Sequence, residues 1–101
     1  SNANSALNGN TPLITYNTAV GYQALQGSAT AASNTGNNNT AVGYQSLKNT
    51  TSGAGNSSYG VSSLTSNTTG TYNTGMGFQS LTNSTTGSYN VGVGMYALRT
   101  L

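Results

Sequence analysis

Residues 39–47 read Asn-Thr-Ala-Val-Gly-Tyr-Gln-Ser-Leu, and variants of this phrase occur five times in a chain of 101 residues. The copies begin at Asn17, Asn39, Asn56, Asn73 and Asn90, so successive copies are 22, 17, 17 and 17 residues apart. Self-similarity at a fixed period is the sequence signature of a solenoid, in which each copy buries its apolar side chains against its neighbours. The repeat therefore predicts an all-β fold, a parallel β-solenoid or β-roll of about five coils with a 17-residue period.

Within each copy, the Asn is counted as position 0, and Gly then stands at position +4 and Leu at position +8. A Thr-Gly or Ser-Gly turn follows, with its glycine at Gly36, Gly53, Gly70 or Gly87. We expect a strand near positions +1 to +6, a corner at the Leu, a second extended stretch and the turn. The first copy has five extra residues within 27–36, which predict a loop. Helix is disfavoured, because Asn, Thr, Ser and Gly are poor helix formers and no stripe of helical period occurs.

Two apolar residues flank the Gly at position +4 in every copy, and this alternation places both side chains on one face of a strand. We expect these pairs to pack together in the core. The third copy reverses the order of aromatic and aliphatic residue, so that stacking would place Tyr59 between Val42 and Met76 at a similar total volume. The pairs are Val20/Tyr22, Val42/Tyr44, Tyr59/Val61, Met76/Phe78 and Val93/Met95.

The glycine column between these pairs indicates a close approach of another backbone or a tight corner of the coil. If another backbone does approach the glycine column, the simplest source of that backbone is a second copy of the chain. Each coil has only about three large apolar side chains, so the core of one chain is thin. Small scaffolds commonly compensate for a thin core by oligomerising. We therefore expect an elongated homotrimer of parallel chains, with a monomeric solenoid as the alternative.

The composition excludes most chemistry. The chain has no Asp, Glu, His or Cys, and its only charged side chains are Lys48 and Arg99. General acid–base catalysis, an activated Ser or Thr, and zinc or transition-metal sites all need residues that are missing. We expect no enzyme activity, no catalytic, cofactor-binding or metal-binding residue and no cofactor, while the ligand-binding residues are unknown. Two charges do not form a nucleic-acid-binding surface, and no apolar run is long enough to insert into a membrane.

The repeat also divides the chain into segments. Residues 1–3 are typical of an expression-tag remnant, and residues 4–16, which contain Ala6-Leu7, are expected to be part of a preceding coil. Residues 17–101 form the predicted repeat domain. No capping element is evident at either end, which favours a fragment of a longer fibre.

The motif from Asn39 to Leu47, followed by Thr-Thr-Gly turns, resembles the repeats of phage and virus tail-fibre proteins. It is also similar to the β-roll head repeats of trimeric autotransporter adhesins. The resemblance covers residues 17–98 and implies a trimeric, fibrous arrangement. It implies a virion tail fibre or, alternatively, an extracellular or cell-surface location. The adhesin repeats are shorter than 17 residues and lack the aromatic at position +5, so handedness and receptor-binding residues are not carried over.

The leading functional hypothesis is a structural or adhesive fibre segment that contributes to host attachment. A host cell-surface glycan or receptor is the expected partner, with Tyr72 and Tyr89 contacting it or simply packing over the turn.

Two alternatives remain. One is an ice-binding solenoid with threonine columns at Thr51, Thr68 and Thr85, or at Thr18, Thr40, Ser57 and Thr74. The other is a surface array glycosylated at five Asn-x-Ser/Thr sequons, although sequons also arise by composition alone in a chain rich in Asn, Thr and Ser. They are Asn38, Asn49, Asn56, Asn67 and Asn83.

Overall fold

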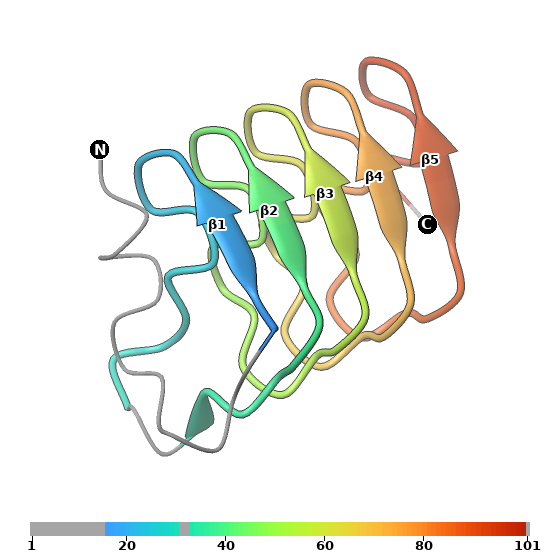
Figure 1. Ribbon diagram of the computed structural model, residues 1–101. Helices are drawn as coiled ribbons and strands as arrows, with labels where there is room; N and C mark the ends of the chain where they lie inside the picture. Colours follow the sequence, from blue (N-terminus) through green and yellow to red (C-terminus); the bar gives the residue numbers. More distant parts are fainter. Residues whose placement is uncertain (1–15, 31–32, 101) are drawn as a thin grey trace.

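The computed structural model describes residues 16–30 and 33–100, which form a stack of coils around one parallel sheet (Figure 1). Each strand pairs with the strand of the next coil, so the order in the sheet is the order in the sequence. The strands are β1 (Thr18–Val20), β2 (Thr40–Val42), β3 (Ser57–Tyr59), β4 (Thr74–Met76) and β5 (Val91–Val93). The predicted all-β parallel solenoid is confirmed.

The register of the sheet confirms the 17-residue period. Ala41 pairs with Ser58 and Ser58 with Gly75, each 17 residues apart. Three complete 17-residue turns occur, at 39–55, 56–72 and 73–89. The first coil is wider and includes residues outside the described part, and the last coil ends after part of a turn. The expected number of about five coils is therefore too high for complete turns.

Most of the terminal segments named above lie outside the described residues. This applies to the expected tag remnant at 1–3, to residues 4–15 of the expected preceding coil and to Leu101.

Each strand is three residues long, shorter than predicted, because the Gly at position +4 turns the backbone. Gly43 has a φ of +128° and Gly60 a φ of +129°, a conformation that side-chain-bearing residues rarely adopt. Hydrogen bonds between coils continue past the strand, from Gly43 N–H to the Val20 carbonyl at 2.8 Å. The second extended stretch also forms hydrogen bonds between coils, for example from Thr51 N–H to the Thr68 carbonyl at 2.9 Å. Within the described residues, however, this stretch contains no strand.

The predicted corner at the Leu of position +8 is confirmed, and its backbone is left-handed. Leu64 has a φ of 53°, although a left-handed conformation costs an L-residue about 1–2 kcal/mol. The cost is offset by burial, since Leu64 is fully inaccessible to solvent and its N–H donates to the Ser80 carbonyl at 2.9 Å. The same conformation recurs at Leu25, Leu47, Leu81 and Leu98.

The interior has an apolar half, built from the Leu column and the small residues of position +2. Leu47, Leu64 and Leu81 stack beneath Ala41 and the equivalent residues of the following strands. Only a small residue fits at position +2: a Cβ on Gly75 would lie 2.6 Å from Ser63 Oγ.

The interior also has a polar half, which is a ladder of the Asn residues at position 0. The Asn56 Oδ1 accepts from the Asn73 backbone N–H at 2.9 Å. The Asn56 Nδ2 donates to the Gly70 carbonyl at 2.9 Å and to Asn39 Oδ1 at 3.1 Å. Because buried polar groups are costly unless they are paired, this ladder allows Asn to form part of a core.

The prediction that the pairs flanking the glycine pack in the core is wrong. The predicted neighbours are correct, since Tyr59 pairs with Val42 on one side and Met76 on the other. Their side chains, however, point outward, and Val93 and Met95 are 65% and 68% exposed. Strand alternation places positions +1 and +3 outward when position +2 faces the interior.

The glycine column has its explanation within one chain. A Cβ on Gly43 would lie 2.7 Å from the carbonyl oxygen of Gly60, the equivalent glycine of the next coil. Together with the positive φ, this close approach supports the tight-corner interpretation. The column therefore carries no argument for a second copy of the chain.

The loop predicted in the first coil is closed by a side chain. Asn34 is buried, and its Oδ1 accepts from the Ser28 backbone N–H at 2.9 Å while its Nδ2 donates to the Ser28 carbonyl at 3.0 Å. The chain rejoins the stack where Thr35 N–H donates to the Thr51 carbonyl at 3.0 Å.

Candidate interaction surface

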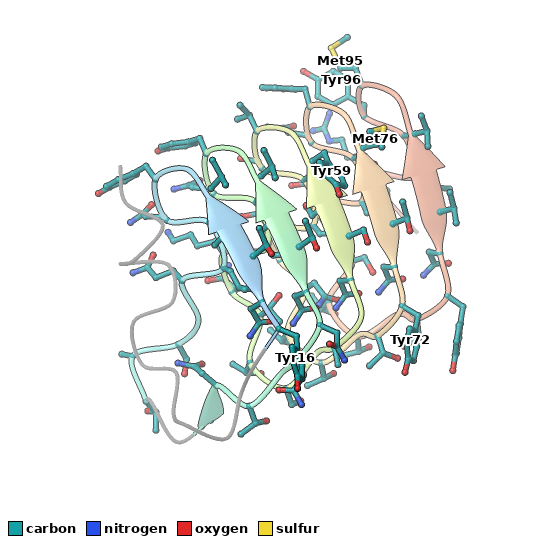
Figure 2. The ribbon with its side chains drawn as sticks, viewed as in Figure 1. Tyr16, Tyr59, Tyr72, Met76, Met95 and Tyr96 are labelled. Carbon is teal, nitrogen blue, oxygen red and sulfur yellow. The ribbon has the colours of Figure 1, made fainter. Side chains whose placement is uncertain are left out.

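The outward side of the coil stack carries a continuous apolar surface, which we call the apolar face. It consists of two columns, at positions +3 and +5, on the two sides of the glycine column. Figure 2 shows Tyr59 and Met76 near the carboxyl ends of β3 and β4, with Met95 at the tip of the last coil. The residues of the face are Val20, Tyr22, Val42, Tyr44, Tyr59, Val61, Met76, Phe78, Val93 and Met95.

All residues of the face except the half-buried Val42 are exposed, and aromatic rings of neighbouring coils contact one another at this surface. The rings of Tyr22 and Tyr44 are stacked with centroids 5.9 Å apart, and the rings of Phe78 and Tyr96 form a T-shaped pair with centroids 5.6 Å apart. Such ring pairs contribute about 0.5–1.5 kcal/mol beyond the area they bury. The face is therefore an ordered surface rather than a set of scattered apolar side chains.

No charged residue belongs to the apolar face. The Arg99 guanidinium lies 5.0 Å from the ring centroid of Tyr96, at the end of the stack. Shape and apolar contact are consequently what this face offers to a partner. In proteins exposed to water, large apolar patches commonly mark interaction sites.

A second group of exposed aromatic side chains lies at the opposite ends of the strands, where Figure 2 shows Tyr16 and Tyr72. Tyr72 and Tyr89 are stacked with centroids 5.6 Å apart and an interplanar angle of 16°. A Cβ on Gly55 would lie 2.6 Å from the Tyr72 ring, so this ring does pack over the coil below. Tyr72 is nevertheless 59% exposed, which leaves a stacked pair of rings accessible to a ligand.

The two threonine columns differ in what their hydroxyl groups do. In the column of Thr51, Thr68 and Thr85, the Thr51 Oγ1 donates to the Thr68 carbonyl and the Thr68 Oγ1 to the Thr85 carbonyl, both at 3.2 Å. These hydroxyl protons are used between coils. The column of Thr18, Thr40, Ser57 and Thr74 lies in register along the outward side of the sheet, beside the apolar face.

The sequons fall into two groups. Asn38, Asn49 and Asn83 are exposed, whereas Asn56 and Asn67 are completely buried. A glycan on either buried residue is incompatible with the closed coil.

The sequence contains no Asp, Glu, His or Cys, the residues that most often act in catalysis or bind metals. Over 16–30 and 33–100, three buried polar atoms have no hydrogen-bond partner: Gln26 Oε1, Ser63 Oγ and Asn67 Oδ1. They belong to different parts of the coil and do not form a cluster of reactive groups. No helix in the described part of the chain is long and apolar enough to cross a membrane.

Comparison of the chain with protein-family models, with curated proteins and with solved structures found no match. The resemblance to tail-fibre and adhesin repeats therefore stays a hypothesis that rests on the repeated motif.

Proposed function

We propose that this chain is a non-enzymatic structural segment of a fibre, and that it assembles side by side with parallel copies of itself through the apolar face. The observation that carries the proposal is the apolar face itself, which follows the coil stack from Val20 to Met95 and contains no charge. Burying apolar surface contributes about 25 cal/mol per Å², so leaving this face in water is unfavourable.

A second copy fits this face because both surfaces have the same period. Neighbouring parallel strands lie about 4.7–4.9 Å apart, and a copy of the chain has the same spacing along its own stack. A contact made at one coil is therefore repeated at each of the other coils. Three copies, the number that the resemblance implies, enclose the face around a common axis in an elongated trimer.

The surroundings of such a fibre follow from its surface. Asn, Thr, Ser and Tyr dominate the parts outside the apolar face, which favours a viral tail fibre or a cell-surface adhesin in contact with a neutral host glycan or receptor. The stacked rings of Tyr72 and Tyr89 are the best candidates for that contact. Retention of the chain on a neutral-glycan array tests whether these two rings contact a glycan, with the Tyr72→Ala/Tyr89→Ala variant as the control. Binding that is equal in the variant would rule out this pair.

Light scattering after size exclusion tests the assembly. At micromolar concentration we expect three times the chain mass of 10.1 kDa. Met76→Lys places a charge on the face at a residue that is already 45% exposed, so the chain is expected to fold and to remain monomeric. Thr69→Lys, at an exposed site away from the face, is the matched control and is expected to retain the trimer mass. A monomeric mass for the unaltered chain would reject the proposal.

Ice binding is the second candidate function, and it is favoured by one observation. Thr18, Thr40, Ser57 and Thr74 form a regular outward column on a parallel sheet. The interruption at Ser57 and the bulky apolar column beside it argue against a flat hydroxyl surface. Thermal hysteresis of the purified chain distinguishes the candidates: a measurable gap that Thr40→Tyr removes would support ice binding, and its absence would eliminate it.

A further inference from the structure

We propose that the third coil, in which the large and small residues of the apolar face are reversed, sets the register in which copies of the chain align. This inference rests on the proposed side-by-side assembly. It adds that the copies associate without stagger, coil against identical coil. Coils are numbered here by their strands, so that coil 3 contains β3.

The apolar face carries one smaller and one larger side chain in each of the first four coils. In coils 1 and 2 a Val stands at position +3 and a Tyr at position +5, and in coil 4 the pair is Met76 and Phe78. Coil 3 alone has the order reversed, with Tyr59 at position +3 and Val61 at position +5.

The interior of the chain does not require this reversal. Tyr59 and Val61 are 38% and 40% exposed, and the buried neighbours of coil 3 are the Leu, Asn and Ser residues described above. Within the single chain, the common order would leave the core of coil 3 unchanged. The reversal therefore concerns what covers the face.

In a cyclic assembly of parallel copies, each interface is heterologous, so one edge of the face on one copy meets the other edge on its neighbour. The column at position +3 of one copy then faces the column at position +5 of the next. Without stagger, a small residue meets a large one in coils 1, 2 and 4, for example Val42 against Tyr44. In coil 3 a large residue, Tyr59, meets a small one, Val61, and the volume of each of these layers is preserved.

A stagger of one coil breaks this complementarity. Tyr59 then meets Tyr44 or Phe78, depending on direction, and two large side chains occupy one layer. In an adjacent layer Val61 then meets Met76 in the first case or Val42 in the second, and the layer with two Val side chains leaves a gap. Overpacking and voids both destabilise an interface. If coil 3 had the common order, this mismatch would not arise on staggering, and a repetitive face would specify its register weakly.

Disulfide trapping tests the register, because the chain has no cysteine of its own. Met76→Cys is co-refolded with Phe78→Cys, which reports alignment without stagger, or with Met95→Cys, which reports a stagger of one coil. A mass tag on one chain identifies the mixed disulfide. We expect the unstaggered disulfide in excess by about tenfold or more, since one mismatched layer is sufficient to shift an equilibrium by that factor.

Two variants of the face complete the test. Tyr59→Val/Val61→Tyr restores the common order in coil 3 and is expected to bring the two disulfides to similar yields. A further change in that background, Val42→Tyr/Tyr44→Val, moves the reversal to coil 2. Mixed with the unaltered face, this last chain is expected to align with a stagger of one coil, so that the reversed coils meet. All four sites lie on the outward surface, and circular dichroism verifies that each variant is folded.

The outcomes separate the two proposals. A monomeric mass for the unaltered chain overturns the assembly and, with it, the register. An oligomer that yields both disulfides equally overturns the register alone. An unstaggered preference that persists in Tyr59→Val/Val61→Tyr also overturns it, because the reversal is then not the cause.

Discussion

In the five-stranded sheet the small side chains point inward and the large apolar side chains point outward, which is the reverse of an ordinary half-buried sheet. The inward side, at position +2, carries Ala, Ser and Gly, whereas the outward side, at position +3, carries Val, Tyr and Met. The interior is already filled by the Leu residues of position +8 and the Asn residues of position 0, so only small residues fit beneath the strands. The inward side thus holds the coil together, and the outward side remains available for partners. The two roles can be separated by mutation.

The largest effect is expected where one coil meets the next, at Gly60→Ala. The new Cβ would lie 2.7 Å from the Gly77 carbonyl oxygen at a φ of +129°. Backbone strain in a region open essentially to glycine alone, together with the separation of two coils, is expected to cost about 5 kcal/mol or more, an exceptionally large single-residue effect. Urea denaturation, followed by circular dichroism, measures the loss.

Gly94→Ala is the matched control for this variant. Its φ is +121°, but no atom lies within 4 Å of the added Cβ. Only the conformational strain of about 1–3 kcal/mol is then expected. Equal losses in the two variants would show that coil stacking does not explain the glycine column.

A smaller effect is expected in the apolar half of the interior. Leu64→Ala removes a side chain that is 0% exposed, and core truncations of this kind cost about 2–5 kcal/mol. Val61→Ala, three residues earlier on the outward side, is expected to cost less than about 1 kcal/mol in the monomer, because Val61 is already partly in contact with water. Denaturation at several protein concentrations distinguishes the stability of the chain from that of an assembly. A Val61→Ala loss as large as that of Leu64→Ala in the monomer would contradict the assignment of the two sides.

The smallest of the three effects is expected in the polar half of the interior. Asn56→Ala leaves the buried Asn73 N–H without the acceptor that it has at 2.9 Å. An unsatisfied buried donor costs about 1–3 kcal/mol. The exposed Asn83 serves as the control, and Asn83→Ala is expected to change the free energy of unfolding by less than about 0.5 kcal/mol. If both substitutions were neutral, the ladder would not contribute to the stability of the coil.

The repeat was sufficient to predict where each strand begins, the register, the corner at Leu and the loop in the first coil, but not that each strand ends before the Gly at position +4. These features depend on spacing along the chain, which the sequence contains directly. The side to which the pairs at positions +3 and +5 point was predicted wrongly, because alternation shows that two residues share a face but not which face is buried. That choice is made by the cross-section of the coil, where the side chains of Leu64 and Asn56 fill the interior and leave room only for the small residue at position +2.

A better signal was present in the sequence. Asn at position 0 and Leu at position +8 are identical in all five copies, whereas positions +3 and +5 vary among Val, Tyr, Met and Phe. Residues that must fit one fixed interior vary less between copies than residues on an outward surface. The apolar face was thus located correctly from the sequence as a set of residues, but its role as a surface was not.

The hydrogen bonds between coils have a mechanical consequence. They connect each layer to the next, as between Thr40 N–H and the Asn56 carbonyl at 2.8 Å, and so they are directed along the axis of the stack. Pulling on the ends of the stack loads these layers in series, and the weakest layer opens first. Each opened coil releases 17 residues, or about 55–60 Å of extended chain, in place of a rise of about 4.8 Å. A fibre made of such coils lengthens stepwise under load and absorbs work at each step before its ends detach.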